Sequence, residues 1–262
     1  MRVLSIARDL QRRHARERHG LFIAEGVRTV AELLHSPLTI RGVLAAPAPD
    51  LTHTEPLLVA VRERGIPVQE VTSAEFASAS GTETPQGILA IAEVPQCDLT
   101  TLQLTEPFRL LVLDGVQDPG NVGTIVRTAA ALGAAAIVSL PGTVDLWNAK
   151  VVRSSMGALF HHPTLACTWE ELTAFRFERQ FSLWGADAAG ESLFRLVQGG
   201  DAIPARLALA VGNEGAGLSA RTRESADKLV SVEIAPAVES LNVAVATGIL
   251  LYELRLNDRN KS

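Results

Sequence analysis

Side chains able to bind a ligand gather in the segment 114–127, directly after a run of apolar residues. The apolar run Leu110–Leu113 stops at Asp114, a turn-rich loop with Asn121 follows, and a helix of small residues contains Arg127. Asp, Asn and Arg offer donors and acceptors to the polar groups of a ligand. A helix that only fills a core has no need of an arginine beside such a loop. We therefore expect this strand–loop–helix unit to form one wall of a ligand site.

A second loop of this kind is rich in glycine. It follows the apolar run Leu207–Val211 and reads Gly-Asn-Glu-Gly-Ala-Gly over residues 212–217. Glycine lets a backbone approach a ligand closely and adopt dihedral angles that other residues resist. The order of these glycines differs from the two nucleotide-phosphate signatures, and no lysine follows them. Because Glu214 would repel a phosphate, the loop favours a neutral or cationic ligand.

A third polar stretch, 238–248, follows the apolar run Leu229–Ile234 and opens a predicted helix. Ser240 fits the N-cap position of that helix, which is a purely structural role. Capping by Ser240 does not explain Asn242 in the first turn. We expect Asn242 to face the same strand ends as the other two loops, so that all three share one site.

The elements that must position these loops form the second of two predicted α/β domains, residues 108–262. Strands alternate with helices along it, which implies a mostly parallel sheet that binds ligands beyond the carboxyl ends of its strands. The expected strands are Leu110–Leu113, Ala136–Leu140, Phe181–Gly185, Leu207–Val211 and Leu229–Ile234, and the expected helices include Thr124–Leu132 and a long one over Leu241–Leu256.

Residues 1–97 predict a smaller α/β domain in which helices pack on a sheet. The stretch 98–107 contains Thr, Gln and Pro without periodicity, and we interpret it as the linker between the domains. The expected elements of the first domain are helices at Glu25–His35, Pro56–Arg64 and Ser73–Ser80 and strands at Ile40–Ala45, Pro67–Val71 and Gly87–Ala92.

The composition is that of a compact globular protein. The chain has 262 residues, a hydrophobic content of 47% and a mean hydropathy of +0.18, which argue against long disordered segments. Its apolar stretches are too short to span a membrane, and its start lacks the pattern of a signal peptide. Its cysteines, Cys97 and Cys167, have no metal-ligand spacing. We therefore expect a cytoplasmic protein without a metal site.

Arginines are concentrated in the first thirty residues, although the net charge of the whole chain is −5. A local cluster of this kind can neutralise phosphates even when the rest of the chain is acidic. One interpretation is therefore contact with RNA, and the alternative is a solvated amphipathic helix with Leu4, Ile6 and Leu10 on its apolar face. The candidate RNA ligands in this cluster are Arg12, Arg13, Arg16 and Arg28.

The three loops together resemble those of the SpoU (TrmH-like) family of the SPOUT superfamily, whose members methylate ribose 2′-hydroxyls of RNA. The matching blocks are Asp114–Ala129, Gly212–Leu218 and Glu239–Ala246, so the resemblance covers the whole second domain. The first domain resembles the ribosomal-protein-like RNA-binding domain that many members have, at Phe22–Arg28 and Thr84–Gly87.

The resemblance implies that the second domain has a SPOUT-type parallel sheet with a trefoil knot in its C-terminal loops. It also implies S-adenosylmethionine as the cofactor and a homodimer as the functional form. Family members hold the cofactor largely through backbone groups, and the positions that match those groups here are Leu140, Gly212, Ile234 and Leu241.

The resemblance further assigns a catalytic role to Arg127, which matches the arginine of the family's first motif. Methyl transfer to a hydroxyl needs in-line alignment and stabilisation of the negative charge that grows on the oxygen. Because arginine is a poor general base, we favour Arg127 as the group that orients the 2′-hydroxyl and its neighbouring phosphate. A role as general base is the alternative. The other matching polar residues are Asn121, Glu214, Ser240 and Asn242, and Arg153 is a further candidate RNA ligand.

The chain departs from the family pattern just before Ser240. The stretch 235–239 is shorter than the usual sequence and lacks its methionine and glycine. This departure leaves a catalytically silent RNA-binding protein of the same fold as an alternative function. A nucleotide-dependent oxidoreductase is disfavoured by the order of the glycines in 212–217. By analogy with relatives that share the extra first domain, rRNA is favoured over tRNA as the substrate.

Overall fold

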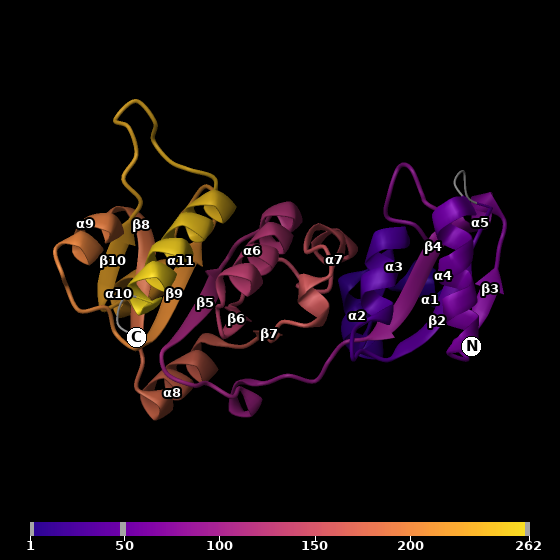
Figure 1. Ribbon diagram of the computed structural model, residues 1–262, viewed down its shortest axis with the longest axis horizontal. Helices are drawn as coiled ribbons and strands as arrows, with labels where there is room; N and C mark the ends of the chain where they lie inside the picture. The colour runs from indigo at the N-terminus through magenta and orange to yellow at the C-terminus, as the bar shows by residue number, and fades with distance from the viewer. Residues whose placement is uncertain (1–2, 48–50, 260–262) are drawn as a thin grey trace. The chain divides into compact units, whose positions relative to one another are not determined.

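The chain folds as two compact units (Figure 1), in a computed structural model that describes residues 3–47 and 51–259. The described residues up to Gln96 form the N-terminal unit together with Trp147–His161, and the other described residues form the C-terminal unit. Each unit has its own sheet and its own hydrophobic core.

The N-terminal unit is a four-stranded mixed sheet covered by short helices, which confirms the predicted small α/β domain. Its strands are β1 (Leu21–Glu25), β2 (Ile40–Ala45), β3 (Val68–Glu70) and β4 (Ile88–Glu93), and its helices include α1 (Val3–Asp9), α2 (Arg13–His19), α3 (Val27–Leu34), α4 (Leu51–Glu63) and α5 (Ser73–Ala77). In the order β1-β4-β2-β3, β4 pairs antiparallel with β1 and β2, and β2 pairs parallel with β3. The predicted elements omit β1, because a short run of buried residues cannot be told from a helical segment by periodicity.

A segment from later in the chain completes the core of this unit. It contains α7 (Ala149–Ser154) and the 3-10 helix η2 (Ala158–Phe160). The ring of Phe22 on β1 contacts Trp147 and Phe160, with centroids 4.5 and 5.8 Å apart. The segment therefore packs as part of the N-terminal unit, although in sequence it lies within the predicted second domain.

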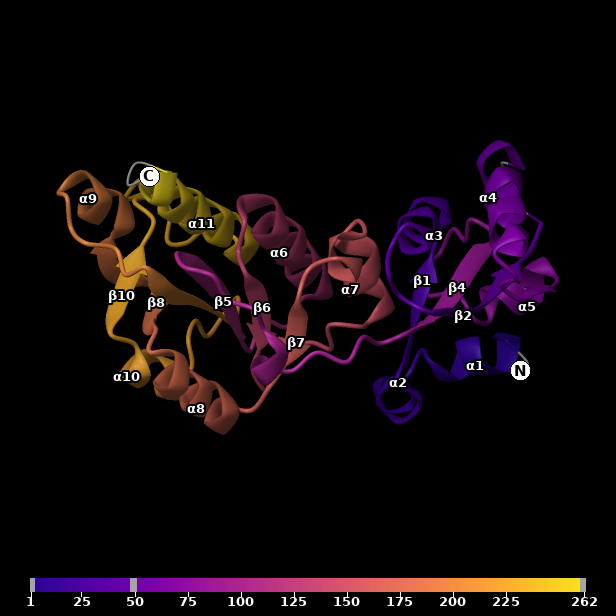
Figure 2. The same cartoon turned by 60° about the horizontal axis from the view of Figure 1, so that its bottom comes forward.

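The C-terminal unit is built on a six-stranded sheet in which every pair of neighbouring strands is parallel. This confirms the predicted parallel sheet, and the order is β10-β8-β9-β5-β6-β7. The strands are β5 (Phe108–Asp114), β6 (Ala136–Ser139), β7 (Thr164–Ala166), β8 (Ser182–Ser192), β9 (Arg206–Gly212) and β10 (Lys228–Ser231), and the helices are α6 (Pro119–Leu132), α8 (Trp169–Arg179), α9 (Leu193–Gln198), α10 (Ala220–Ser225) and α11 (Val243–Arg259). Figure 2 shows α6, α9 and α11 on one face of the sheet and α8 and α10 on the other.

The strands β5 and β9 lie side by side in the middle of this sheet. Every residue of β5 is buried, and Leu113 and Asp114 pair with Val211 and Gly212 of β9. Strands that are covered by helices on both faces need such continuous apolar runs. Because the two strands end level with each other, the loops that follow them start at the same edge of the sheet.

The predicted linker 98–107 is ordered against the C-terminal unit. Leu99, in a short 3-10 helix η1 (Leu99–Thr101), and Leu102 are buried in the core of that unit. Asp98 caps η1 by accepting hydrogen bonds from the backbone N–H groups of Thr100 and Thr101. Two buried leucines thus fix a stretch whose overall composition predicts only a connection.

The helix α6 begins earlier than the sequence predicts. Asp118 is its N-cap, with a side-chain oxygen 2.8 Å from the backbone nitrogen of Asn121. Pro119 occupies the first helical position, where a residue without an N–H group loses no hydrogen bond. Asn121 therefore belongs to the first turn of α6 and has a fixed direction.

Candidate active site

Three segments of the C-terminal unit meet at the carboxyl edge of the sheet. They are the loop after β5, the glycine-rich loop after β9 and the segment that leads into α11. Side-chain hydrogen bonds join the first two through Glu214 and the first and third through Asn121 and Asn242. These are the loops that the sequence predicts to share a site.

Glu214 is the centre of this network. Its carboxylate accepts hydrogen bonds from the backbone N–H groups of Gln117 and Asp118, at 3.2 and 3.1 Å, and from the side-chain amide of Asn121, at 3.0 Å. Bonds of this type, to an ionised acceptor, are stronger than those between neutral groups. One carboxylate on the glycine-rich loop therefore holds both the loop after β5 and the first turn of α6.

The same hydrogen bonds keep Glu214 charged. Partial burial acts to raise its pKa, but the bonds from Asn121, Gln117 and Asp118 stabilise the carboxylate, and the net result is a pKa below the usual value. Glu214 is therefore ionised at neutral pH and contributes a negative charge to the site.

Asn121 extends the network to α11. Its Oδ1 accepts a hydrogen bond from Nδ2 of Asn242 at 2.9 Å. The Oδ1 of Asn242 in turn accepts a bond from the backbone N–H of Ala244 at 2.9 Å, which is the geometry of a helix N-cap. The predicted N-cap, Ser240, is therefore wrong: α11 begins at Val243, and Asn242 caps it while bonding to Asn121.

The glycine-rich loop closes on itself as a tight hairpin. Asn213 and Gly217 exchange two backbone hydrogen bonds, each of 2.9 Å. The side chain of Asn213 accepts two more, from the N–H groups of Gly215 and Ala216. A Cβ atom on Gly212 would lie 2.2 Å from the carbonyl carbon of Gly217, so no other residue fits there. In this loop the close approach that glycine permits is between Gly212 and the backbone of Gly217. This contact fixes the shape of the loop.

A cavity of about 540 Å³ opens beside this network, between the glycine-rich loop, the segment before α11 and the start of α11. Its volume lies in the range of pockets that hold cofactor-sized molecules. The predicted site residues that line it are Gly212, Glu214, Ile234, Ser240, Leu241 and Asn242.

Leu140 is the predicted cofactor residue that does not reach this cavity. Its side chain is buried in the core of the unit, and its backbone N–H bonds to the carbonyl of Leu113 at 2.9 Å. The strand that it follows, β6, lies on the far side of β5 from β9. The cavity is built around β8, β9 and β10 instead, and Leu140 is not among the residues that line it.

Two charged residues of the cavity are missing from the sequence prediction. Asp187 on β8 and Arg223 on α10 line the cavity and form an ion pair. Asp187 lies two residues after the predicted end of its strand at Gly185, so the rule that ligands bind beyond strand ends was sufficient to find it. Arg223 lies on a helix of one or two turns that leaves no periodic signal.

Arg127 lies outside this cavity. It is on α6, about 9 Å along the helix axis from Asn121. Its exposed side chain borders a shallow hollow of about 460 Å³ together with Gly248, Ile249 and Tyr252 of α11. The predicted catalytic residues are therefore divided within the chain. Glu214, Ser240 and Asn242 line the cavity, Asn121 is bonded to two of them, and Arg127 lies apart beside α11.

Arg16 is not available to RNA in this fold. It is only 6% exposed, and its guanidinium donates hydrogen bonds to the carbonyl oxygens of Leu10 and Gln11 at 2.7 and 3.0 Å. These bonds hold the turn between α1 and α2. The residue therefore has a structural role, and we remove it from the set of RNA ligands.

The other predicted RNA ligands belong to the N-terminal unit and are accessible to different extents. The side chains of Arg12 and Arg13 are 77% and 64% exposed, and each pairs with a nearby carboxylate. Arg28 is exposed on α3, and Arg153 is half-buried on α7. They remain candidates on the grounds of charge and accessibility.

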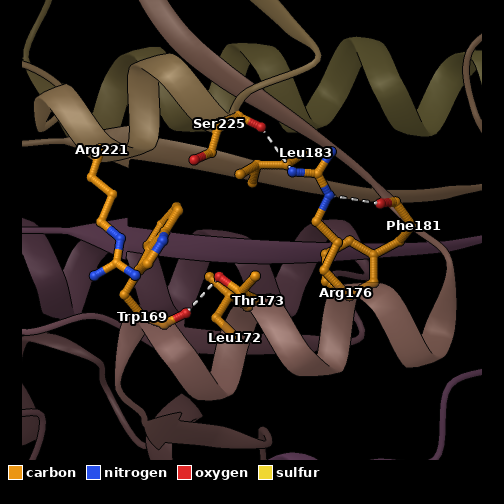
Figure 3. A pocket seen from close by; sticks show the side chains of 8 residues that line it. All are labelled: Trp169, Leu172, Thr173, Arg176, Phe181, Leu183, Arg221 and Ser225. Atoms are coloured by element: carbon orange, nitrogen blue, oxygen red, sulfur yellow. Dashed lines mark hydrogen bonds between the residues drawn. The ribbon is translucent and has the colours of Figure 1, made fainter.

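A separate cavity of about 470 Å³ lies between α8 and α10 (Figure 3). Arg176 there donates hydrogen bonds to the carbonyl oxygens of Phe181 and Ser225. Arg221 lies over the ring of Trp169, 5.3 Å from its centroid. No predicted site residue lines this cavity, so we place the candidate active site at the cavity beside the glycine-rich loop.

Metal-binding clusters and membrane-spanning helices are not found in residues 3–47 and 51–259. No three or more His, Cys, Asp or Glu residues in these ranges come together as a metal site. No helix there is long and apolar enough to cross a membrane.

Burial, with the charge of Glu171 nearby, raises the pKa of Cys167 to about 12, so its thiol stays protonated at neutral pH.

Comparison with known families agrees with both units. The SpoU rRNA Methylase family matches residues 109–252, and the MRM3-like substrate binding domain matches residues 4–90. The three loops at the cavity lie within the first of these matches. The chain belongs to the SpoU rRNA methylase family.

Similar proteins match over nearly the whole chain. It is 33% identical over 248 residues to the 23S rRNA (guanosine(2553)-2'-O)-methyltransferase RlmP of Bacillus subtilis, covering 95% of this chain and 94% of that protein. It is 34% identical over 236 residues to the 23S rRNA (guanosine-2'-O-)-methyltransferase RlmB of Pasteurella multocida, covering 87% and 95%.

Solved structures are similar over the full length as well. The SpoU methyltransferase AviRb from Streptomyces viridochromogenes, in complex with AdoMet, has a TM-score of 0.85 at 27% identity and covers 100% of this chain and 99% of its own. The AdoMet-bound rRNA methyltransferase from Sinorhizobium meliloti has a TM-score of 0.83 at 29% identity, with coverage of 97% and 94%.

Proposed function

We propose that this protein transfers a methyl group from S-adenosylmethionine to a ribose 2′-hydroxyl of RNA, with ribosomal RNA as the substrate. The observation that carries the proposal is the network of Glu214, Asn121 and Asn242 beside the cavity lined by Gly212 and Leu241. It joins three loops of the family match around a cofactor-sized space and puts polar groups at its edge. The activities named for the RlmP and RlmB relatives support rRNA over tRNA.

The cavity has the chemistry that S-adenosylmethionine requires. Apolar side chains such as Val211, Ile234 and Leu241 can cover the adenosine part, and the carboxylates of Asp187 and Glu214 outnumber the one guanidinium in the wall. The cofactor has a sulfonium and an ammonium group against a single carboxylate, so a wall of net negative charge complements it. When bound, it supplies a methyl group activated for transfer.

The chain's own residues then have separate roles. Ionised Glu214 fixes the amide of Asn121, and Asn121 and Asn242 offer amide groups that can position a ribose. Ser240 adds a hydroxyl to the cavity wall. Arg127 supplies a guanidinium cation that orients the 2′-hydroxyl and the neighbouring phosphate and stabilises the negative charge on the oxygen. The hydroxyl proton passes to that phosphate or to water.

We also propose a homodimer that pairs through α6 and α11. These helices lie side by side (Figure 1), and α11 leaves Val245, Ile249 and Tyr252 exposed at 51%, 38% and 51%. An exposed apolar face of this kind is typical of an interface, and in a two-fold dimer the same face is used by both copies. Arg127 borders this face. Since α11 starts directly after Asn242, pairing would bring each Arg127 towards the cavity of the other copy.

The N-terminal unit is the proposed holder of the RNA. Arg12, Arg13, Arg28 and Arg153 supply positive charge for phosphates, and the family match of this unit is to a substrate binding domain. In sequence the proposed domains are residues 1–97 and 108–262, with Trp147–His161 of the second packing in the unit formed by the first. A trefoil knot in the C-terminal loops and a cytoplasmic location complete the proposal.

Calorimetric titration and a methylation assay test the proposed function. S-adenosylmethionine should bind to the purified protein, and NAD should not, because the glycine-rich loop does not have the dinucleotide pattern. Methyl transfer to ribosomal RNA separates an enzyme from a catalytically silent RNA-binding protein of the same fold. Binding of NAD but not of S-adenosylmethionine, or cofactor binding without any methyl transfer, would overturn the proposal.

A further inference from the structure

The ion pair of Asp187 and Arg223 lies in the wall of the same cavity as Glu214 but takes no part in the hydrogen-bond network of that residue. We infer that this pair binds the amino-acid end of the cofactor, with Asp187 accepting from the ammonium group and Arg223 donating to the carboxylate. The inference rests on the proposed function, because it requires S-adenosylmethionine in this cavity. It adds a determinant of cofactor selectivity that lies outside the family's three sequence blocks.

Asp187 is held in one direction by the protein itself. Its side chain is 10% exposed, Oδ1 accepts a hydrogen bond from the backbone N–H of Ala189 at 2.9 Å, and Oδ2 pairs with the guanidinium of Arg223. An ionised carboxylate has lone pairs for about four hydrogen bonds. These two contacts therefore leave Asp187 with acceptor capacity at the cavity surface.

Arg223 reaches the cavity over the glycine-rich loop. A Cβ atom on Gly217 would lie 4.0 Å from Nη2 of Arg223, so the guanidinium passes directly beside that glycine. Its side chain is 43% exposed. A guanidinium has five N–H donors, and in the described part of the chain Asp187 is its only ionic partner, which leaves donors free for a carboxylate.

The two carboxylates of the cavity wall, Asp187 and Glu214, have different partners. Glu214 is committed to Gln117, Asp118 and Asn121 at the end where the loops meet. A zwitterionic amino acid has one ammonium and one carboxylate group, which an adjacent Asp and Arg match in sign and in hydrogen-bonding capacity. No other pair of opposite charges lines the cavity among the described residues.

A purely structural role for the pair is the competing explanation, since Asp187 on β8 and Arg223 on α10 also tie two elements together. The two explanations predict different ligands whose affinity should depend on the pair. If the pair binds the zwitterion, substitutions in the pair should not change the affinity for a ligand that contains the adenosine but no amino acid. If the pair only shapes the cavity, the same substitutions should weaken the affinity for this ligand as much as the affinity for the full cofactor.

Calorimetric titration of the full-length protein with three ligands makes this distinction. S-adenosylhomocysteine has the complete amino acid, decarboxylated S-adenosylmethionine keeps the ammonium group only, and methylthioadenosine has neither group. The variants are Arg223→Gln and Asp187→Asn. The matched control is Arg221→Gln on the same helix, whose guanidinium lies over Trp169 in the other cavity (Figure 3).

We expect Arg223→Gln to weaken S-adenosylhomocysteine by about ten- to a hundredfold, the effect of losing a charged hydrogen bond. The same variant should change the affinity for methylthioadenosine and for decarboxylated S-adenosylmethionine by less than about threefold. Asp187→Asn should weaken both ligands that contain the ammonium group and spare methylthioadenosine. Arg221→Gln should leave all three affinities unchanged.

The possible failures are separable. Equal weakening of methylthioadenosine and S-adenosylhomocysteine by Arg223→Gln, or no effect on either, refutes the inference and leaves the proposed function intact. Binding of none of these ligands or of S-adenosylmethionine by the unmodified protein overturns the proposed function and the inference together. Retained affinity for methylthioadenosine in each variant shows that the cavity itself is still folded.

Discussion

Replacement of Glu214 by Gln is the sharpest probe of the network that joins the three loops. The carboxylate accepts hydrogen bonds from Gln117, Asp118 and Asn121 at 3.2, 3.1 and 3.0 Å. Glutamine has almost the same shape, but it keeps one acceptor oxygen and presents an NH₂ group, which is a donor, to the remaining N–H donors. The substitution therefore removes charge and hydrogen bonds without leaving a cavity.

The size of the effect follows from the number and exposure of these bonds. A hydrogen bond to a charged group contributes about 1.5–3 kcal/mol when it is well shielded, and solvent exposure of Glu214 reduces this. We expect the free energy of unfolding to fall by about 1–2 kcal/mol in total. For a protein of this size that corresponds to a melting temperature lower by about 2–8 °C.

The sign of the pH dependence adds an independent check. Because the folded protein lowers the pKa of Glu214, its stabilising contribution is present above the ordinary glutamate pKa and is lost as the pH falls through the lowered value. The difference in melting temperature between the unmodified protein and Glu214→Gln should therefore shrink in acid. Thermal unfolding followed by circular dichroism from pH 7 downward measures it, with Glu224→Gln, an exposed glutamate on α10, as the control. Equal melting temperatures at pH 7 for the two variants, or a difference that persists unchanged in acid, would refute the role given to Glu214.

Further predictions concern backbone space, one buried arginine and one thiol. Gly212→Ala should abolish binding of S-adenosylmethionine in a calorimetric titration, because the added Cβ would lie 2.2 Å from the backbone of Gly217; normal affinity contradicts this. Arg16→Ala should lower the melting temperature, because its buried guanidinium bonds to the backbone carbonyls of Leu10 and Gln11. Arg12→Ala should weaken RNA binding in a salt-dependent way and leave the melting temperature unchanged. A lower melting temperature for Arg12→Ala, with weaker RNA binding and an unchanged melting temperature for Arg16→Ala, would contradict both assignments. Cys167 should be alkylated at pH 8 far more slowly in the native protein than in urea, because its pKa is raised to about 12 by burial, and equal rates would show that the thiol is accessible and ionised.

Strong local signals made much of the fold predictable. The strand β2 was predicted with its observed bounds, Ile40–Ala45, because a short, mostly apolar stretch there ends just before Ala46 and Pro47. The parallel sheet of the C-terminal unit followed from the alternation of strands and helices. The meeting of Glu214, Asn121 and Asn242 followed from the rule that parallel strands present their carboxyl ends at one edge.

The features that the sequence missed depend on contacts between distant parts of the chain. Phe22 packs against Trp147 and Phe160. The local sequence around Phe22 and that of the segment 147–161 do not predict this contact. Arg16 looks like any other member of a basic cluster until the fold turns its guanidinium onto backbone carbonyls. Leu140 follows a strand end, as a cofactor residue should, but its strand β6 pairs with β5 on the side away from β9, and Leu140 does not line the cavity.

The most direct test of the central claim is transfer of a labelled methyl group from S-adenosylmethionine to ribosomal RNA, followed by mapping of the label on the nucleotides. The unmodified protein should place the label on a ribose 2′-oxygen. Arg127→Ala should bind the cofactor with unchanged affinity and transfer no label, because Arg127 lies outside the cofactor cavity and acts on the substrate. Label on a base, no label with the unmodified protein, or full transfer by Arg127→Ala would contradict the account.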